Sequence, residues 1–173
     1  MKRLVLAGVL CTALHAGSSQ AQQASPARDV PEGRPEGGGI SEHAFVLPAT
    51  LEWQPGPSAL PQGARMAIIR GDPAEPGLFT MRLRVPDGYR VQPHYHAADE
   101  HVTVISGTAV MGLGDEFDES RGTALPAGGF AVMPAGTVHF LSSRGETVIQ
   151  VHAMGPWKLT YVDPTDDPRT ASR

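Results

Sequence analysis

The chain has 173 residues, the length of one ordinary domain with a core of its own. Its 14 basic and 18 acidic residues give a formal net charge of -4, and no run is strongly basic, so we expect no nucleic acid as a partner. The single cysteine excludes an intrachain disulfide. With 20 glycines and 16 prolines, the sequence leaves little room for long helices.

Residues 1–21 have the pattern of a cleaved export signal. Two basic residues precede a mostly apolar run at 4–14 that is too short to cross a bilayer as a mature helix. Ser19 and Ala21 then place small residues at the -3 and -1 positions of a peptidase site. We therefore expect a periplasmic or secreted protein whose mature form has no membrane span and no cysteine, because Cys11 leaves with the signal.

The rest of the chain changes character at about residue 40. Residues 22–39 are rich in Pro, Gly and polar residues and predict a flexible linker. Residues 40–165 hold many short apolar runs separated by turn residues, which favours an all-β antiparallel barrel or jelly roll, and 166–173 predict a loose tail. A helical turn is expected within 115–121. The predicted strands are 44–47, 64–70, 78–85, 91–93, 100–105, 108–113, 130–133, 138–141, 147–151 and 157–161.

Two stretches carry residues that could hold a metal ion. Alternate side chains of a strand share a face, so His94 and His96 point the same way. A turn follows at 97–99, and we expect the strand beginning at Glu100 to pair with the first strand as a hairpin, which would return the carboxylate to the two imidazoles. His139 follows a Pro-Ala-Gly turn. Together these residues predict a three-histidine, one-carboxylate site with open coordination positions.

The two stretches resemble the two motifs of the cupin superfamily. The first reads Gly, five residues, His-x-His, three residues, Glu, six residues, Gly, over residues 88–107. The second reads Gly, five residues, Pro-x-Gly, two residues, His, over 128–139, and twenty residues separate the motifs. The family often has Asn where this chain has Ser143. The resemblance implies a small single-domain cupin of the type-2 kind, with the double-stranded β-helix, or jelly-roll barrel, of that family.

A site of this mixed nitrogen and oxygen character suits a divalent transition metal, and its ligands alone do not choose among Mn, Fe, Zn, Ni and Co. Gln92 shares the parity of the two ligand histidines in its strand and could reach the site from the rim. Gln150 and His152 share one face of a later strand, where they either line the pocket or face solvent. His101 follows Glu100 directly, so parity turns it to the opposite face.

Three functions fit such a chain. The first is a metal-dependent enzyme acting on a small organic acid or oxygenated small molecule, by dioxygenase, decarboxylase or isomerase chemistry. The second is a non-catalytic module that binds or senses a metal or small ligand, and the third is a barrel with a vestigial site.

Asp99 is adjacent to the ligands, but parity can turn it away. Trp157 and Tyr161 either seal one end of the barrel or stack on a substrate. We also expect a homodimer, with strand 64–70 contributing to the contact.

Overall fold

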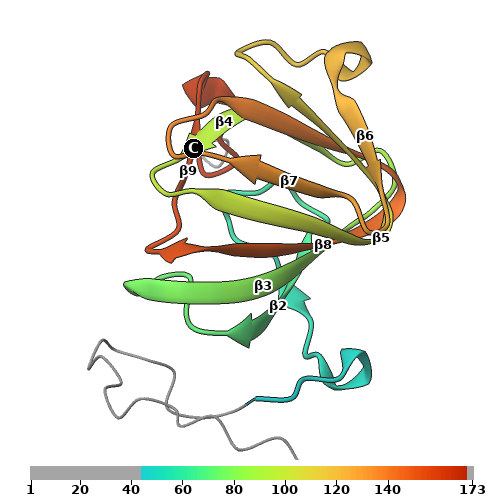
Figure 1. The fold of residues 1–173 in the computed structure, drawn as a ribbon. Coiled ribbons are helices and arrows are strands. Elements are labelled where there is room, and N and C mark those ends of the chain that lie inside the picture. The colour runs from blue at the N-terminus through green and yellow to red at the C-terminus, as the bar shows by residue number, and fades with distance from the viewer. Residues whose placement is uncertain (1–43, 171–173) are drawn as a thin grey trace, which may run out of the picture. The chain divides into compact units, whose positions relative to one another are not determined.

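The computed structural model describes residues 44–170, so the predicted signal at 1–21 and linker at 22–39 lie outside the described residues. The described part is built from strands and three short 3-10 helices (Figure 1). None of these helices is long and apolar enough to cross a membrane. The strands are β1 (Gln54–Pro55), β2 (Arg65–Arg70), β3 (Gly77–Val85), β4 (Arg90–His96), β5 (Glu100–Leu113), β6 (Thr123–Pro126), β7 (Phe130–Met133), β8 (His139–Gly155) and β9 (Leu159–Tyr161). The helices are η1 (Pro48–Thr50), η2 (Glu119–Arg121) and η3 (Pro164–Asp166).

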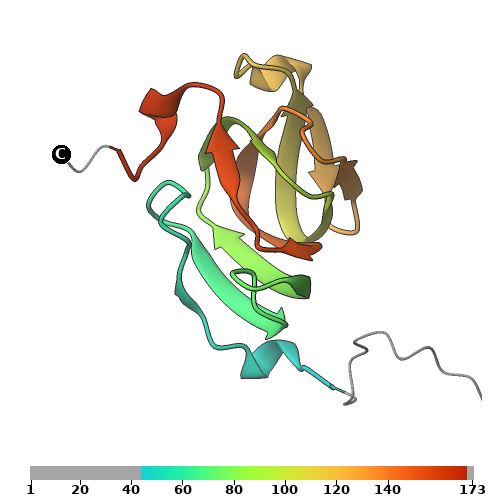
Figure 2. The same cartoon turned by 90° about the vertical axis from the view of Figure 1, so that its left-hand side faces the viewer.

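Two long strands, β5 and β8, run through both halves of a sheet that folds over on itself (Figures 1 and 2). In the first half the order is β1-β2-β3-β8-β5-β7, using residues 147–155 of β8 and 100–104 of β5. In the second half the order is β9-β4-β8-β5-β6, using residues 139–144 of β8 and 108–113 of β5. All pairs are antiparallel, and this double-layered arrangement confirms the predicted all-β jelly-roll barrel.

Both long strands turn from one half to the other at a glycine. Gly107 has a φ of 75° and Gly145 a φ of 72°, a conformation that side chains with a Cβ rarely adopt. At Gly107 a Cβ would also collide with the backbone of Glu146 and Thr147. The buried Thr147 hydroxyl bridges the corner, because it accepts a hydrogen bond from the Thr108 N–H at 3.1 Å and lies 3.1 Å from the Thr108 carbonyl. Glycine is therefore required where the two sheets meet.

The core lies between the two halves. In β3 the predicted alternation is confirmed, since Phe79, Met81, Leu83 and Val85 are buried and the intervening side chains are not. These four residues face apolar residues of β5 and β8 in one continuous cluster. The interior of the barrel is thus filled with hydrocarbon except where the polar site interrupts it.

Three expectations about the strands need correction. The strand that carries the two histidines, β4, pairs with β8 and β9 and does not form a hairpin with β5, because residues 97–99 carry the chain from one sheet to the other. The predicted strand at 44–47 is irregular, and Phe45 is 96% exposed, since no neighbouring strand lies beside it in the described residues. The sequence predicts separate strands at 100–105 and 108–113, but these form the single bent strand β5. The separate strands predicted at 138–141 and 147–151 likewise form the single bent strand β8.

Specific hydrogen bonds order two polar segments of the chain, η2 and the described part of the C-terminal segment. The helical turn expected within 115–121 is η2, which Asp118 caps by accepting a hydrogen bond from the Ser120 N–H at 2.9 Å. In the described part of the segment that we predicted as a loose tail, the Arg169 guanidinium donates to the Leu159 carbonyl at 3.2 Å and to Asp167. This arginine ties the end of the described chain to β9.

Candidate metal centre

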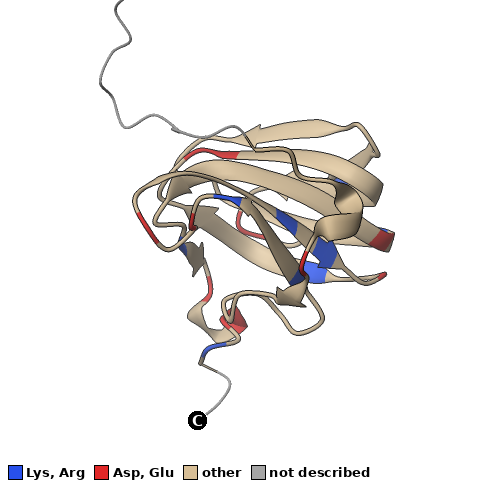
Figure 3. Cartoon of the chain, turned by 90° about the horizontal axis from the view of Figure 1, so that it is seen from below, with Lys and Arg blue, Asp and Glu red and all other residues tan. Residues whose placement is uncertain are grey.

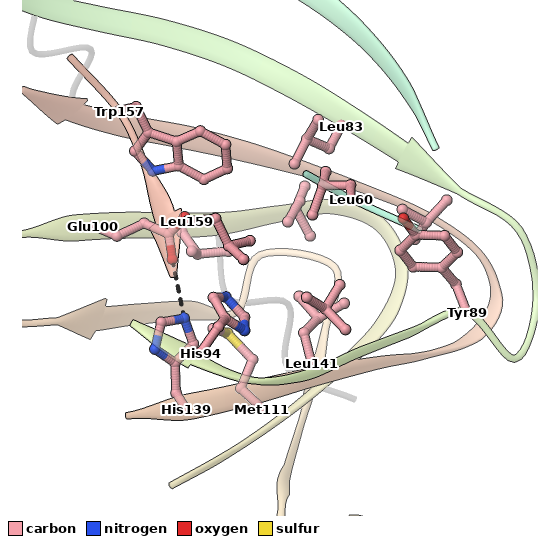
Figure 4. A pocket seen from close by; sticks show the side chains of 14 residues that line it. Leu60, Leu83, Tyr89, His94, Glu100, Met111, His139, Leu141, Trp157 and Leu159 are labelled. Atoms are coloured by element: carbon pink, nitrogen blue, oxygen red, sulfur yellow. Dashed lines mark ion pairs between the residues drawn. The ribbon is translucent and has the colours of Figure 1, made fainter. Parts of the chain in front are cut away.

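Four buried polar side chains meet inside the barrel (Figure 4). His94 and His96 come from β4, Glu100 is the first residue of β5, and His139 is the first residue of β8. Their exposed fractions are 4%, 3%, 5% and 1%. The barrel therefore brings together all four residues that the motif spacing singles out, although Glu100 reaches the histidines from the opposite sheet rather than through a hairpin.

The ligand atoms of the four side chains converge on one point. One nitrogen of each imidazole lies within 4.8 Å of the others. The Glu100 carboxylate lies 3.6 Å from the Nε2 atom of His96 and 3.4 Å from the Nε2 atom of His139, the second contact being the dashed line in Figure 4. Three nitrogens and one carboxylate at such distances surround a space of the size that a single ion fills once the side chains close on it.

Backbone carbonyl groups fix the orientation of every imidazole. The Nδ1 atom of His94 lies 2.7 Å from the Gln92 carbonyl, that of His96 lies 2.9 Å from the Lys158 carbonyl, and that of His139 lies 2.9 Å from the Thr137 carbonyl. A carbonyl oxygen only accepts, so each Nδ1 carries the proton and donates it. The lone pair of each Nε2 is then free and directed into the site, which is the arrangement that orients histidine ligands around metals.

Burial and neighbouring charges keep these groups in the protonation states that a metal needs. The pKa of His94 falls to about 3, chiefly because burial disfavours the imidazolium and also because His139 is close. Burial likewise lowers the pKa of His96. Burial alone would raise the pKa of Glu100, but the contact with His139 and the proximity of His96 outweigh it and lower that pKa. At neutral pH His94 and His96 are therefore neutral and Glu100 is ionised.

The residues present fit a divalent transition metal. The Nε2 atom of His96 is buried and has no hydrogen-bond partner among the described residues, which is costly for a polar atom unless something else binds it. Three imidazoles and one carboxylate are ligands that divalent Mn, Fe, Co, Ni and Zn all accept. The structure thus supports a metal site of this kind and leaves the choice of ion open.

Two hydrogen bonds join the loops that carry the ligands. The Asp99 carboxylate accepts a hydrogen bond from the Ala135 N–H at 2.8 Å, and the His96 carbonyl accepts one from the Gly136 N–H at 2.8 Å. Asp99 is thus exposed and bound to the second motif loop, away from the metal ligands. It acts as a structural link between the loops before His139 and after His96.

Ser143 takes part in a similar link at the position where the cupin family often has Asn. Its hydroxyl accepts a hydrogen bond from the Tyr89 N–H at 3.0 Å and donates one to the Pro86 carbonyl at 2.6 Å. A serine therefore satisfies both backbone groups of the turn that precedes β4, and the departure from the family pattern does not disturb the metal ligands.

An apolar cavity opens beside the centre (Figure 4). Its volume is about 30 Å³, and His94, Glu100 and His139 lie at one end of it. Trp157 covers the remaining ligand, His96, by stacking on its ring with centroids 4.7 Å apart and planes 19° apart. The other lining side chains come from both sheets and from the loop before β2: Leu60, Leu83, Val85, Tyr89, Val91, Val102, Met111, Leu141, Ile149 and Leu159.

The three residues that we predicted as pocket candidates do not line this cavity. Gln92 contributes only its backbone carbonyl, which holds His94. Gln150 and His152 lie on the outer face of β8, since the cavity-facing positions of that strand are those of Ile149 and its alternate neighbours. Gln150 accepts a hydrogen bond from the Arg82 guanidinium at 3.0 Å. Parity establishes which side chains share a face, but not which face is inward.

The outer face of the first sheet is polar and basic. His152 lies 3.0 Å from the Thr80 hydroxyl and 3.0 Å from the Gln150 amide nitrogen. Figure 3 shows basic positions on neighbouring strands, and Arg65 of β2 lies directly opposite Arg84 of β3. His101 is exposed on this face, opposite His152, as parity predicts. These residues form a surface network that is separate from the metal ligands.

Sequence reasoning missed several residues of the cavity. Tyr89, Met111 and Leu60 line it, although Leu60 belongs to a loop rich in proline and glycine. Tyr89 directly follows Gly88 of the first motif. Met111 lies where residues 109–112 of β5 are all buried, and the register of β5 shifts between Val104 and Thr108, so strand parity could not have identified it. Nothing in the local pattern at Leu60 points to the cavity.

The fold, with three converging histidine nitrogens beside the Glu100 carboxylate, defines the class of protein as a cupin with a candidate divalent-metal centre. The sequence profile of the ChrR cupin-like domain matches residues 41–158, and the chain belongs to this family. No curated protein sequence matches the chain.

Solved structures with the same fold are numerous and distant in sequence. The polyketide cyclase RemF from Streptomyces resistomycificus is 15% identical, with a TM-score of 0.62 over 73% of this chain and 90% of that one. A putative acetylacetone dioxygenase from Methylibium petroleiphilum is 22% identical, with a TM-score of 0.57 over 75% and 88%. KdgF from Halomonas sp. is 20% identical, with a TM-score of 0.52 over 66% and 96%. At these identities the likeness establishes the cupin fold alone.

Proposed function

We propose that this protein binds one divalent transition metal through His94, His96, Glu100 and His139 and uses it to bind an oxygen atom of a small organic molecule. The observation that carries the proposal is the set of three Nδ1–H groups held by backbone carbonyls, which leaves the Nε2 atoms free to bind an ion. Those of His96 and His139 lie 3.6 Å and 3.4 Å from the buried Glu100 carboxylate. A bound divalent ion would supply Lewis acidity, which polarises a coordinated carbonyl or carboxylate. The protein's own side chains hold that ion and exclude water around it.

The first candidate activity is enzymatic turnover of an oxygenated small molecule by dioxygenase, decarboxylase or isomerase chemistry. The support for it is a preformed cavity in direct contact with three of the four ligands, so a bound molecule would lie against the ion. To test this activity, the protein is incubated with a series of candidate compounds, with and without O2, and product is measured by mass spectrometry. Turnover that depends on metal and is lost in His139→Ala supports it.

A second candidate, a non-catalytic binding or sensing module, is favoured by a different observation. Among the described residues, the cavity wall offers no acid or base beyond the metal ligands, and the Tyr89 hydroxyl donates its proton to the Pro61 carbonyl at 2.6 Å. A protein of this kind would bind a compound tightly in the presence of metal and return it unchanged. Ligand binding without product over the whole compound series would support this second function.

Metal analysis of ligand variants tests the site itself. His94→Ala, His96→Ala, Glu100→Ala and His139→Ala should each lose most of the metal affinity while retaining the barrel, because the apolar core does not depend on one ligand. His101→Ala is the matched control, since this histidine lies in the same stretch but faces outward. Full metal content in the four variants, or loss in the control alone, would overturn the assignment.

We also propose that the protein is exported and acts as a homodimer. The charged start and small residues of 1–21 support export, and N-terminal sequencing of the purified native protein should then begin near residue 22. β1 pairs only with Arg65 and Met66 of β2, so the rest of β2 is an open edge among the described residues. Such edges are commonly covered by a partner, which supports a dimer that involves β2. Light scattering that gives a monomer at high protein concentration would contradict the dimer.

A further inference from the structure

The cavity beside the metal ligands has walls of hydrocarbon. Leu83 and Val85 reach it from β3, Val91 from β4, Val102 from β5, and Leu141 and Ile149 from β8. All six side chains are at least nine-tenths buried, so they form the fixed lining of a barrel interior rather than a surface groove. A molecule that occupies this space exchanges water for aliphatic contacts over most of its surface.

Polar groups touch the cavity at its two ends only (Figure 4). His94, Glu100 and His139 lie at one end, and Tyr89 lies at the other. The Tyr89 hydroxyl already donates to the Pro61 carbonyl, and none of the lining residues is a lysine or an arginine. The one buried donor of the lining that has no partner among the described residues is the Trp157 indole N–H, which lies at the metal end, beside His96. The Tyr89 end therefore has no cation and no free donor that could hold a second charged group of a ligand.

The loop that contains Leu60 is fixed against the same space. The Tyr89 hydroxyl binds the Pro61 carbonyl, and the Tyr161 hydroxyl donates to the Ala59 carbonyl at 2.8 Å. Both tyrosines are buried, so two phenols hold the loop on either side of Leu60, a residue that lines the cavity. The size of the cavity, about 30 Å³, is thereby set in advance of binding, which limits the ligand to a short hydrocarbon chain.

We infer that the ligand of this site is an apolar molecule with a single oxygen-bearing head group. The head group lies at the metal end and the hydrocarbon body lies against the aliphatic walls. This inference rests on the proposed function for the head group, and it goes beyond that proposal by excluding dicarboxylates and highly hydroxylated compounds as preferred ligands. A second polar group would lose its water in the cavity and gain no partner there.

Straight-chain carboxylates test the inference on the full chain loaded with Zn²⁺. Acetate, propionate, butyrate and hexanoate are titrated by calorimetry, and succinate is compared with butyrate at equal carbon number. We expect affinity to rise about fourfold for each added methylene until the cavity is full, because burial of one methylene contributes about 0.8 kcal/mol. Succinate should bind at least about tenfold more weakly than butyrate, since its second carboxylate has no partner.

A matched pair of substitutions tests the wall directly. Val102→Thr keeps the shape of the side chain and places a hydroxyl in the cavity, so it should weaken butyrate binding about tenfold and leave Zn²⁺ binding unchanged. Thr103→Val makes the reverse change at the next residue of β5, on the face away from the cavity, and should leave butyrate binding unchanged. If Val102→Thr does not fold, Val91→Thr makes the same test from β4.

The outcomes separate the two proposals. Tight binding of Zn²⁺ with equal or stronger binding of succinate than of butyrate, or with no dependence on chain length, overturns the inference and leaves the metal site intact. Failure of the wild-type protein to bind any divalent ion overturns the proposed function, and the head-group assignment is lost with it. Chain-length dependence in the wild-type protein that is reduced in Val102→Thr and kept in Thr103→Val supports the inference.

Discussion

The indole of Trp157 lies nearly parallel to the imidazole of His96, with ring centroids 4.7 Å apart and an angle of 19° between the planes. On its other side the same indole meets Phe79 edge to face at 6.4 Å. Trp157 therefore connects a metal ligand to the apolar core, and it covers the face of His96 that would otherwise meet water or the ligand. This contact gives the metal centre a fluorescent group of its own.

Removal of that cover should weaken the site. Trp157→Ala is expected to lower metal affinity about tenfold, the lower end of the range for residues that orient ligands. It should also lower the free energy of unfolding by about 2 kcal/mol, because the side chain is only partly buried. Metal titration and urea melts measure the two effects. Trp53→Phe is the control, since Trp53 packs under the Arg84 guanidinium at 4.1 Å, and its metal affinity should be that of the wild type.

The same pair of variants isolates an optical signal. In Trp53→Phe the remaining emission comes from Trp157, and added Co²⁺ or Ni²⁺ should quench it because the ion binds beside the stacked imidazole. The quenching should follow the metal titration curve. Emission of Trp157 that stays constant while metal binds would contradict the placement of the ion beside His96.

The hydrogen bond between Asp99 and Ala135 should stabilise the two ligand loops together. Asp99→Ala removes the acceptor and is expected to cost about 1 kcal/mol of unfolding free energy and to speed metal dissociation. Asp99→Asn keeps an acceptor oxygen, so its unfolding free energy and its rate of metal dissociation should be close to those of the wild type. Stopped-flow metal release into a chelator and thermal melts provide the measurements. Equal rates of metal release for the wild type and both variants would show that this hydrogen bond does not stabilise the two ligand loops.

The metal-free protein should lose stability in acid. The folded-state pKa of His94 is about 3, below its ordinary value of about 6.5, so the unfolded chain binds more protons between these two values. This contribution to the free energy of unfolding is therefore fully present above about pH 6.5 and is lost as the pH decreases toward 3. A pKa shift of this size implies a loss on the order of a few kcal/mol. The lowered pKa of Glu100 acts in the same direction.

Urea melts of the metal-free protein at a series of pH values measure this slope. His94→Gln replaces the titrating ring with a neutral amide, so its unfolding free energy should change less between pH 6.5 and 4 than that of the wild type. His101→Gln is the matched control on the outer face and should retain the wild-type slope. Identical slopes for all three proteins would show that His94 does not titrate as described.

Alkaline solution should have a related effect through the tyrosines that hold the Leu60 loop. Burial, assisted by Asp167, raises the pKa of Tyr161 to about 12. A phenol in the unfolded chain ionises near pH 10, so the stability contributed by burying the neutral phenol is present below that value and is lost as the pH rises toward 12. Tyr161→Phe should lower stability by about 1 kcal/mol at pH 8, through the lost bond to Ala59, and flatten the alkaline slope.

The corner glycines provide a test of the fold. Gly107→Ala combines an unfavourable positive φ with a collision against the backbone of Glu146 and Thr147, and it should destabilise the protein by more than about 3 kcal/mol. Gly145→Ala has nearly the same φ but open space around its Cβ, so it should cost only about 1 kcal/mol. Similar urea midpoints for the two variants would contradict the close approach at Gly107.

Motif spacing and strand parity singled out the four side chains that meet inside the barrel and the outward direction of His101, because these depend on the local period of a strand. Their role as metal ligands stays a prediction. They could not predict which strand lies beside β4, since pairing is decided by contacts far apart in sequence. The hairpin expected around residues 97–99 was wrong for this reason. β6 was missed because its Thr-Ala-Leu-Pro sequence has neither alternation nor β-branched apolar residues.

The two bent strands have a consequence for how the protein unfolds. Because β5 and β8 each belong to both sheets, neither sheet can be assembled from a continuous piece of chain. His139 at the start of β8 and Ile149 in its second half are joined by one backbone that bends at Gly145. An opening that pulls β8 out of either sheet therefore releases a metal ligand and a wall of the cavity together, and unfolding of the barrel and release of its contents become a single cooperative event.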